Sequence, residues 1–317
     1  MGYKVLVTPR SLAEAFSEPL RTLEDSGHEV IRNPHGRPFT EEELRALIRD
    51  VDGIIVGLDS ISRDVIAAAE KLKVISKYGV GVDNIDLQAA RARGIVVTYT
   101  PGGNSEAVAD LTMGLMLAAA RRIPSGDRAV RSGDWRKVVG LAVWKKTIGV
   151  VGVGRIGRGV VRRASGFNMR ILCCDKVIDN DFAARYAAEY VPLDLLLRES
   201  DFVTLHVPLT DETRGLIGER ELSQMKRTAI LINTARGEVV DEDALYQALA
   251  EGRIAGAALD VFRNEPPTGS RLLGLDNVIL TPHIGAHTDE AILEMGRNAV
   301  KNLMAVLNGE LPEGVAW

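Results

Sequence analysis

The sequence has 317 residues, of which 46% are hydrophobic and 26% are charged, and its formal net charge is −4. These proportions are typical of a globular protein with a sizeable core, and no stripe of lysine or arginine supports binding to nucleic acid. No apolar run reaches the ~18 residues of a membrane span, and the only two cysteines, Cys173 and Cys174, are adjacent, so we expect a cytoplasmic protein.

Short β-branched runs alternate with longer amphipathic stretches along the chain. Strands are predicted at residues 4–8, 53–57, 73–76, 94–98, 147–152, 169–174, 201–206, 229–233, 255–260 and 277–281. Helical patterns occupy residues 11–27, 40–50, 62–72, 155–166 and 241–252. Most strand candidates are nearly continuous apolar runs, as in parallel strands that are buried on both faces. The repeated strand–helix units predict a doubly wound α/β architecture.

Two longer helices divide the predicted strands into two sets. The first runs from about residue 104 to residue 131, with a bend at residues 122–126, where Pro124 interrupts the helical hydrogen bonds. The second runs from about residue 288 to residue 308. We therefore predict two domains: residues 1–98 plus 287–317, and an inserted domain of residues 99–286.

A glycine motif follows the strand at 147–152 and opens a helix. Gly152, Gly154 and Gly157 give G-x-G-x-x-G, the pattern of a dinucleotide-binding turn. A pyrophosphate would bind the backbone N–H groups of Arg155 and Ile156 at the positive end of the helix. The alternative is a glycine-rich turn in another kind of α/β protein.

An acidic residue completes this motif. Asp175 ends the next strand at the spacing that the dinucleotide pattern requires, and its carboxylate would accept hydrogen bonds from the ribose hydroxyls. It would also repel a 2′-phosphate, which favours NAD over NADP. Lys176 weakens this preference, because a lysine can pair with a phosphate.

Three polar residues follow predicted strands in the second half of the chain: Arg236, Glu265 and His283. Ligands bind at the carboxyl ends of strands in open parallel sheets. A cation can hold a substrate carboxylate, an imidazolium can deliver a proton, and a carboxylate can orient the imidazole and favour its cationic form. Reduction of a 2-oxo acid needs these three groups. Taken singly, each could instead be a surface arginine, a turn glutamate or a loop histidine.

The spacing of His283 and His287 raises a further possibility, a metal site. An i, i+4 pair on one helix face is typical of zinc sites. Pro282 and Gly285 favour a loop around His283, and neither cysteine stands in a ligand pattern, so we expect no metal. His287 is predicted to cap the last helix or to support the domain hinge.

The motifs GVGRIG, HVPLTDETRGLI, INTARGEVVDEDAL, ALDVFRNEPP and TPHIGAHT together resemble those of the D-2-hydroxyacid dehydrogenase family. The resemblance implies a flavodoxin-like substrate domain with an inserted Rossmann domain that binds NAD. It also implies a homodimer, with the helix after Asn104 in the subunit interface.

The resemblance implies roles for individual residues. Arg236 would anchor the substrate carboxylate, His283 would be the acid/base and Glu265 its partner. The backbone N–H groups of Val80 and Gly81 would also hold the carboxylate. Further cofactor contacts would come from His206, Pro208, Thr213, Asn233, Thr234, Ala235, Asp260, His283 and Gly285.

The loops of the first domain bear on the substrate. Lys77, Arg10 and Tyr78 follow predicted strands and are expected to line the pocket. Lys77 could bind a second anionic group, which favours a substrate such as 3-phosphoglycerate, or it could be solvated or paired with an acid. Glyoxylate or hydroxypyruvate is the alternative substrate. Formate dehydrogenases of this fold have glutamine in place of Glu265, so the glutamate favours oxidation of hydroxy acids and reduction of oxo acids. A third possibility is a non-enzymatic NAD-sensing corepressor.

Overall fold

A computed structural model describes residues 2–14, 18–35 and 37–316 and divides the chain into two compact units. Unit 1 comprises residues 1–104 and 286–317, and unit 2 comprises residues 105–285. The sequence placed these divisions at 98/99 and 286/287. The segment before residue 105 belongs with unit 1, where the backbone N–H of Thr100 donates to the Gly79 carbonyl at 2.9 Å.

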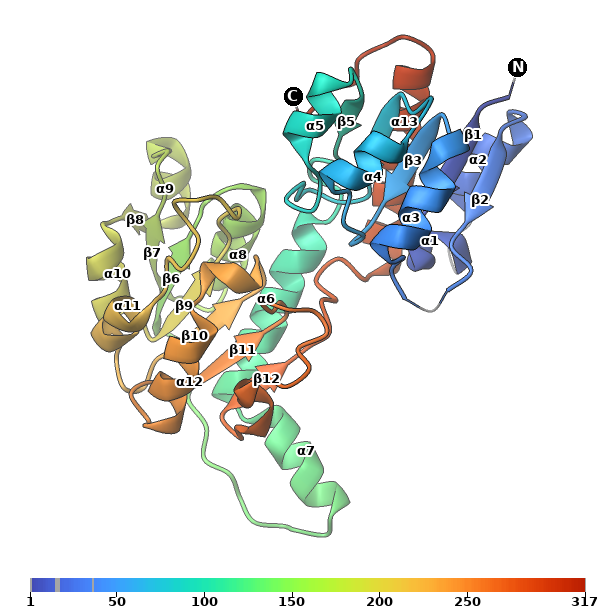
Figure 1. The fold of residues 1–317 in the computed structure, drawn as a ribbon. Helices are drawn as coiled ribbons and strands as arrows, with labels where there is room; N and C mark the ends of the chain where they lie inside the picture. Colours follow the sequence, from blue (N-terminus) through green and yellow to red (C-terminus); the bar gives the residue numbers. More distant parts are fainter. Residues whose placement is uncertain (1, 15–17, 36, 317) are drawn as a thin grey trace. The chain divides into compact units, whose positions relative to one another are not determined.

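Unit 1 contains a parallel sheet with the strand order β2-β1-β3-β4-β5, which is the flavodoxin-like order (Figure 1). Its described strands are β1 (Lys4–Val7), β2 (Glu29–Arg32), β3 (Gly53–Val56), β4 (Val74–Lys77) and β5 (Val96–Thr98). The helices are α1 (Arg10–Glu14), α2 (Glu18–Asp25), α3 (Glu41–Leu47), η1 (Ile48–Asp50), α4 (Arg63–Ala68), α5 (Leu87–Ala92) and α13 (Asp289–Leu307). One core cluster joins the sheet to α3, α4 and α5, and the other joins it to α2 and α13.

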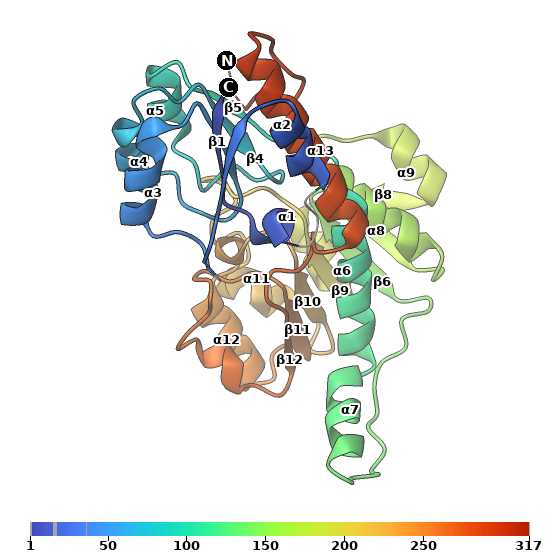
Figure 2. The same ribbon diagram turned by 90° about the vertical axis from the view of Figure 1, so that its right-hand side faces the viewer.

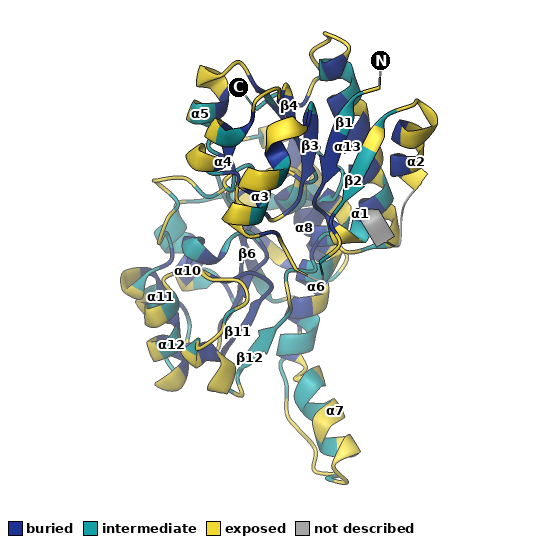
Figure 3. Cartoon of the chain, turned by 45° about the vertical axis from the view of Figure 1, so that its right-hand side comes forward, coloured by how far each residue is buried: buried dark blue, intermediate teal, exposed yellow. Residues whose placement is uncertain are grey.

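Unit 2 contains a parallel sheet with the order β12-β11-β10-β9-β6-β7-β8, the usual Rossmann order with one added strand. Its described strands are β6 (Thr147–Val151), β7 (Arg170–Cys174), β8 (Ala188–Tyr190), β9 (Phe202–Leu205), β10 (Ile230–Asn233), β11 (Gly256–Leu259) and β12 (Val278–Leu280). The central strands are buried along their length, as Figure 3 shows for β6 and β11.

Helices cover both faces of the sheet in unit 2. They are α6 (Ser105–Ala120), α7 (Ile123–Arg131), α8 (Arg155–Ser165), α9 (Asn180–Tyr186), α10 (Leu193–Glu199), α11 (Glu219–Gln224), η2 (Gly237–Val239), α12 (Glu242–Ala250) and η3 (Arg271–Gly274). One core cluster contains side chains of α6 and α8, and the other contains side chains of α10, α11 and α12. The predicted fold class, two doubly wound parallel-sheet domains, is confirmed.

The single helix predicted from residue 104 to 131 is wrong in one respect, because it is two helices. The break lies before Pro124, at Arg122, whose φ of 51° is left-handed. Pro124 instead stands in the first turn of α7, where its missing N–H costs no hydrogen bond. Figure 2 shows α7 extending beyond the end of the seven-stranded sheet.

No helix in the described part of the chain combines the length and the apolar character that crossing a bilayer requires.

Candidate active site

The glycine turn between β6 and α8 has the shape that a dinucleotide needs. Gly152 has a φ of +90°, and a Cβ added there would lie 2.7 Å from the His206 carbonyl carbon. A Cβ on Gly157 would lie 2.0 Å from the Gly152 carbonyl oxygen, so helix and turn touch. A Cβ on Gly154 would meet no described atom within 4 Å. The turn is therefore closed on its protein side and open at the helix N-terminus, where Arg155 and Ile156 begin α8.

Asp175 stands beside this turn, at the end of β7. Its Oδ2 accepts from the backbone N–H of Val153 at 2.6 Å, and its Oδ1 accepts from the N–H of Val177 at 2.9 Å. These two bonds fix the carboxylate and leave further acceptor sites for ribose hydroxyls. Lys176 forms an ion pair with Glu212, so its charge is balanced within the protein.

His206 follows β9 and is neutral. Its Nε2 bonds to the Thr204 hydroxyl, and its Nδ1 is buried without a partner among the described residues. Burial lowers the pKa of His206 to about 3. The next turn is closed by the Thr213 hydroxyl, which donates to the Pro208 carbonyl at 2.6 Å. Cofactor contacts by these residues stay predictions.

The loop after β10 presents Arg236. Asn233 closes the turn, because its Nδ2 donates to the Arg236 carbonyl at 2.8 Å and its Oδ1 accepts from the Ala235 N–H at 3.0 Å. The buried Thr234 hydroxyl lies 2.9 Å from that of Thr112 on α6. The half-buried guanidinium of Arg236 donates from Nη1 to the Ala235 carbonyl at 2.7 Å.

His283 and Glu265 lie in contact. The His283 Nδ1 is 2.7 Å from Oε2 of Glu265, and the other carboxylate oxygen accepts from the Phe262 N–H at 3.1 Å. The carboxylate of Glu265 is thus held by the Phe262 N–H through one oxygen and holds the imidazole of His283 through the other. This arrangement leaves Nε2 as the ring nitrogen available for proton transfer, on a side chain that is 27% exposed.

Asp260 fixes the backbone around His283. Its Oδ1 accepts from the Thr281 hydroxyl at 2.6 Å and the Ile284 N–H at 2.9 Å, and its Oδ2 accepts from the Gly285 N–H at 2.8 Å. His283 has a left-handed φ of 53°, a conformation that a non-glycine residue keeps only where its surroundings hold it. Asp260, predicted as a cofactor contact, therefore supports the histidine loop.

Arg236, Glu265 and His283 follow β10, β11 and β12, which are neighbours in the sheet. The first two loops touch, since a Cβ on Gly237 would lie 2.0 Å from the carbonyl carbon of Phe262. Unit 2 therefore presents a cation and an imidazole–carboxylate pair along the carboxyl edge of one sheet. This arrangement can bind a carboxylate and transfer a proton.

In unit 1 the polar side chains predicted to line a pocket have partners in the protein. Lys77 is only 5% exposed, and its Nζ donates to the Gly57 carbonyl at 2.5 Å and to Asn84 Oδ1 at 2.8 Å. The Tyr78 hydroxyl donates to the Ile292 carbonyl at 3.3 Å, and burial raises its pKa to about 12.

The backbone loop after β4 is more accessible. Val80 is 40% exposed and Gly81 is half-buried, so both N–H groups lie in a surface loop. Arg10, at the start of α1, is exposed.

The histidine pair does not share a helix. Residues 281–287 are irregular, and α13 begins after Thr288, whose hydroxyl accepts from the Ala291 N–H at 3.2 Å. Thr288, rather than His287, is therefore the N-cap of the last helix. Among the described residues, no three His, Cys, Asp or Glu side chains gather as metal ligands would.

Several known proteins are similar to this chain. Residues 113–285 match the model of the D-isomer specific 2-hydroxyacid dehydrogenase NAD-binding domain. The chain is 50% identical to a glyoxylate reductase of Korarchaeum cryptofilum over 87% of this chain and 85% of that one. It is 46% identical to a D-3-phosphoglycerate dehydrogenase of Methanocaldococcus jannaschii over 98% of its own length and 59% of the relative's.

The chain belongs to the D-isomer specific 2-hydroxyacid dehydrogenase family. The TT0316 protein of Thermus thermophilus has a crystal structure that matches with a TM-score of 0.89 and 40% identity, over 99% of this chain and 100% of that one. The predicted family is thus confirmed, and with it an NAD-dependent oxidoreductase. The glycine turn and Asp175 fit this dehydrogenase cofactor.

Several groups that build the dehydrogenase site were missed by sequence reasoning. They include the Phe262 N–H, which holds Glu265, and the Thr281 hydroxyl, which bonds to Asp260. No motif marks these groups, because a backbone N–H has no residue signature and a threonine after a strand is common.

Proposed function

We propose that this dehydrogenase reduces small 2-oxo acids of the glyoxylate or hydroxypyruvate type to the corresponding 2-hydroxy acids, with the D configuration where C2 becomes chiral. The observation that carries the proposal is the contact between His283 Nδ1 and Glu265 Oε2 at 2.7 Å, in which Phe262 holds the carboxylate. The carboxylate at Nδ1 orients the ring and leaves Nε2 as the nitrogen that can exchange a proton with the substrate.

When bound, NADH would supply the hydride that C2 of the substrate gains. The imidazolium of His283 would give its Nε2 proton to the carbonyl oxygen, so the C=O group becomes CH–OH and the imidazole becomes neutral. Glu265 keeps the ring oriented throughout. In the oxidation of a hydroxy acid, neutral Nε2 would accept the hydroxyl proton.

Binding of the substrate carboxylate would fall to Arg236, with the backbone N–H groups of Val80 and Gly81. A guanidinium can bond to a carboxylate through two parallel N–H groups, which also orients the adjacent carbonyl. The closed turn at Asn233 would hold the arginine backbone in place for this contact.

A substrate without a second anionic group is favoured over one with a phosphate. The sequence favoured a second anionic group bound by Lys77, but that ammonium is buried and donates to Gly57 and Asn84. Phosphohydroxypyruvate remains the second candidate, because the D-3-phosphoglycerate dehydrogenase relative aligns with 98% of this chain. Arg10 is the exposed cation that could serve it.

We also propose that NAD is preferred over NADP. Asp175 would repel a 2′-phosphate, and the neighbouring cation Lys176 forms an exposed ion pair with Glu212. A cytoplasmic homodimer is proposed as the working form.

The test is the loss of NADH absorbance with glyoxylate, hydroxypyruvate, phosphohydroxypyruvate and pyruvate, repeated with NADPH. We expect turnover of the first two, with a higher kcat/KM for NADH. His283→Asn should lower kcat by about 10³-fold, as expected for loss of a general acid, and leave the Kd for NADH unchanged. His287→Asn is the matched control and should keep kcat. Turnover of none of these acids, or an active His283→Asn variant, would contradict the proposal.

A further inference from the structure

The carboxyl edge of the sheet in unit 1 contains a cluster of buried polar side chains. Thr8, Asn33, Asp59 and Lys77 are each between 3% and 6% exposed. A lysine this deeply buried is uncommon, and burying its charge is costly unless the ammonium is hydrogen-bonded.

Lys77 joins two loops. At least two hydrogens of its ammonium are engaged, one by the Gly57 carbonyl at 2.5 Å and one by Asn84 Oδ1 at 2.8 Å. The amide of Asn84 in turn donates to the Gly57 carbonyl at 3.1 Å and to the Asp59 carbonyl at 2.6 Å. Lysine and asparagine thus connect the loop after β3 with the loop after β4.

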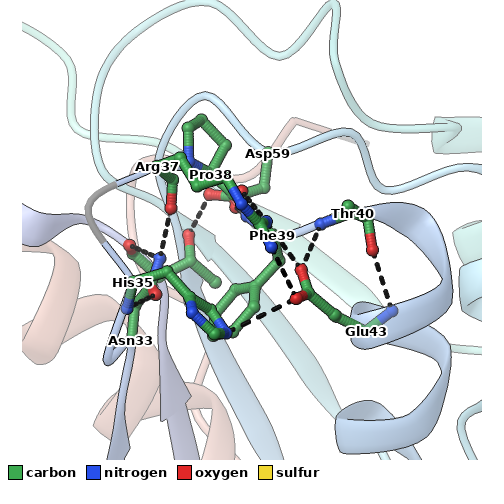
Figure 4. Close-up of polar contacts among 9 residues, drawn as sticks. Asn33, His35, Arg37, Pro38, Phe39, Thr40, Glu43 and Asp59 are labelled. Carbon is green, nitrogen blue, oxygen red and sulfur yellow. Dashed lines mark hydrogen bonds and ion pairs between the residues drawn. The ribbon is translucent and has the colours of Figure 1, made fainter.

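The same cluster reaches a third loop. Asp59 Oδ1 accepts from the Phe39 N–H at 2.8 Å, and its Oδ2 accepts from the Thr8 hydroxyl. Figure 4 shows Asp59 beside Phe39. The loop that contains Phe39 is held by Glu43, whose carboxylate accepts from the Arg37 guanidinium and from the Thr40 N–H. The loop after β3 is therefore held from both sides and gives Lys77 a fixed anchor.

Residues 79–85 form the loop that Lys77 holds. Gly79 anchors its start, because its N–H donates to the Thr100 hydroxyl at 3.1 Å. Its far end is anchored by the Ile61 N–H, which donates to the Asn84 carbonyl at 2.8 Å. Val80 and Gly81 lie between these anchors, so the place of Asn84 limits where their N–H groups can point.

We propose that Lys77 is a positioning residue for the substrate carboxylate, and not a receptor for a second anion. Its ammonium sets the course of residues 79–85 and thereby the direction of the Val80 and Gly81 N–H groups. The proposal rests on the proposed function, in which these two groups bind the carboxylate that every 2-oxo acid shares.

The substitution Lys77→Met tests this role, because it keeps the length of the side chain and removes the charge and the donors. We expect KM to rise about tenfold for glyoxylate and for phosphohydroxypyruvate alike, the loss typical of one charge-assisted hydrogen bond. The change in kcat should be smaller, and the Kd for NADH should stay constant. Lys77→Arg, which can donate to two acceptors, should recover most of the KM.

The matched control is Lys73→Met, just before the same strand. Lys73 pairs with Asp52 at 3.6 Å and its side chain is 51% exposed, so its removal should change neither KM. Hydrogen exchange gives a readout that does not depend on turnover: amides 79–85 should exchange faster in Lys77→Met and not in Lys73→Met. Lys77→Gln replaces Lys77→Met if the latter does not fold.

Two results would overturn the proposal. A KM that rises only for phosphohydroxypyruvate would make Lys77 an anion receptor, and unchanged KM values with unchanged exchange would leave it no positioning role. An inactive wild-type enzyme would instead contradict the proposed function, and hydrogen exchange would still decide whether Lys77 orders the loop.

Discussion

At the scale of single residues, the candidate site residues could be predicted, but the hydrogen bonds that hold them in place could not. Glu265 and His283 could be paired from the sequence, because each follows a strand and their chemistry is complementary. The place of Asp260 could not be predicted in the same way. Two of its three partners are backbone N–H groups of a loop, and the loop conformation, with His283 at a φ of 53°, exists only in the folded chain. Site residues are therefore predicted more readily than the contacts that hold them.

His206 should make stability depend on pH. Its pKa falls from 6.5 to about 3 on folding, so between these values the unfolded chain binds a proton that the folded chain does not. The contribution of His206 to the free energy of unfolding is therefore fully present above pH 6.5. It is lost as the pH falls toward 3, by up to about 1.4 kcal/mol per pH unit.

Urea unfolding at pH 7 and pH 5 measures this effect. The wild type should lose about 1–2 kcal/mol more than His206→Gln over this interval, because glutamine does not titrate. An equal loss in both proteins would mean that His206 is protonated in the folded state. His35→Gln is the control: the His35 side chain is 40% exposed and lies 3.5 Å from Glu43, and this variant should follow the wild type.

At the scale of elements, every central strand was predicted, but only two of the four edge strands were, β5 and β12. The buried strands of both sheets appear as apolar runs in the sequence, whereas β2 and β8 were missed. β2 is half-exposed along its length, and β8 has three residues with an exposed glutamate in the middle. An edge strand has one neighbour, so its sequence need not be apolar on both faces. The bend was predicted from Pro124, but the left-handed φ of Arg122 at which the helices separate was not, because arginine rarely adopts this conformation.

Gly149 of β6 is required by packing. A Cβ added there would lie 2.3 Å from Leu196 Cδ2 and 2.5 Å from Ser200 Oγ, and both residues are fully buried at α10. Gly149→Ala should therefore destabilise unit 2 by about 1–3 kcal/mol, measured by chemical unfolding. The double variant Gly149→Ala with Leu196→Ala should lose less than the sum of the single losses, because the smaller side chain makes room. Additive losses would show that the two positions do not compete for space.

At the scale of the whole molecule, the interrupted order of the chain was predictable from two long helices that separate two strand sets. The order of strands within each sheet followed only from the resemblance to a family, because near-continuous apolar runs do not specify which strand lies beside which. The same limit applies to the surface. α7 and the segment after it expose large apolar side chains, and no sequence pattern indicated that α7 lacks a buried residue.

These exposed side chains predict the subunit interface of the proposed homodimer. Trp135 is 82% exposed, Val139 86% and Trp144 60%, and all three lie in the segment between α7 and β6. In size-exclusion chromatography with light-scattering detection at micromolar concentration, wild-type protein should therefore have twice the chain mass of 34.4 kDa. The double variant Trp135→Glu with Val139→Glu should elute as a monomer, because burying two carboxylates in an apolar contact is costly. Leu311→Glu, 75% exposed in unit 1, is the control and should leave the mass unchanged. A monomeric wild type, or a double variant that remains dimeric, would show that these side chains do not form the subunit interface.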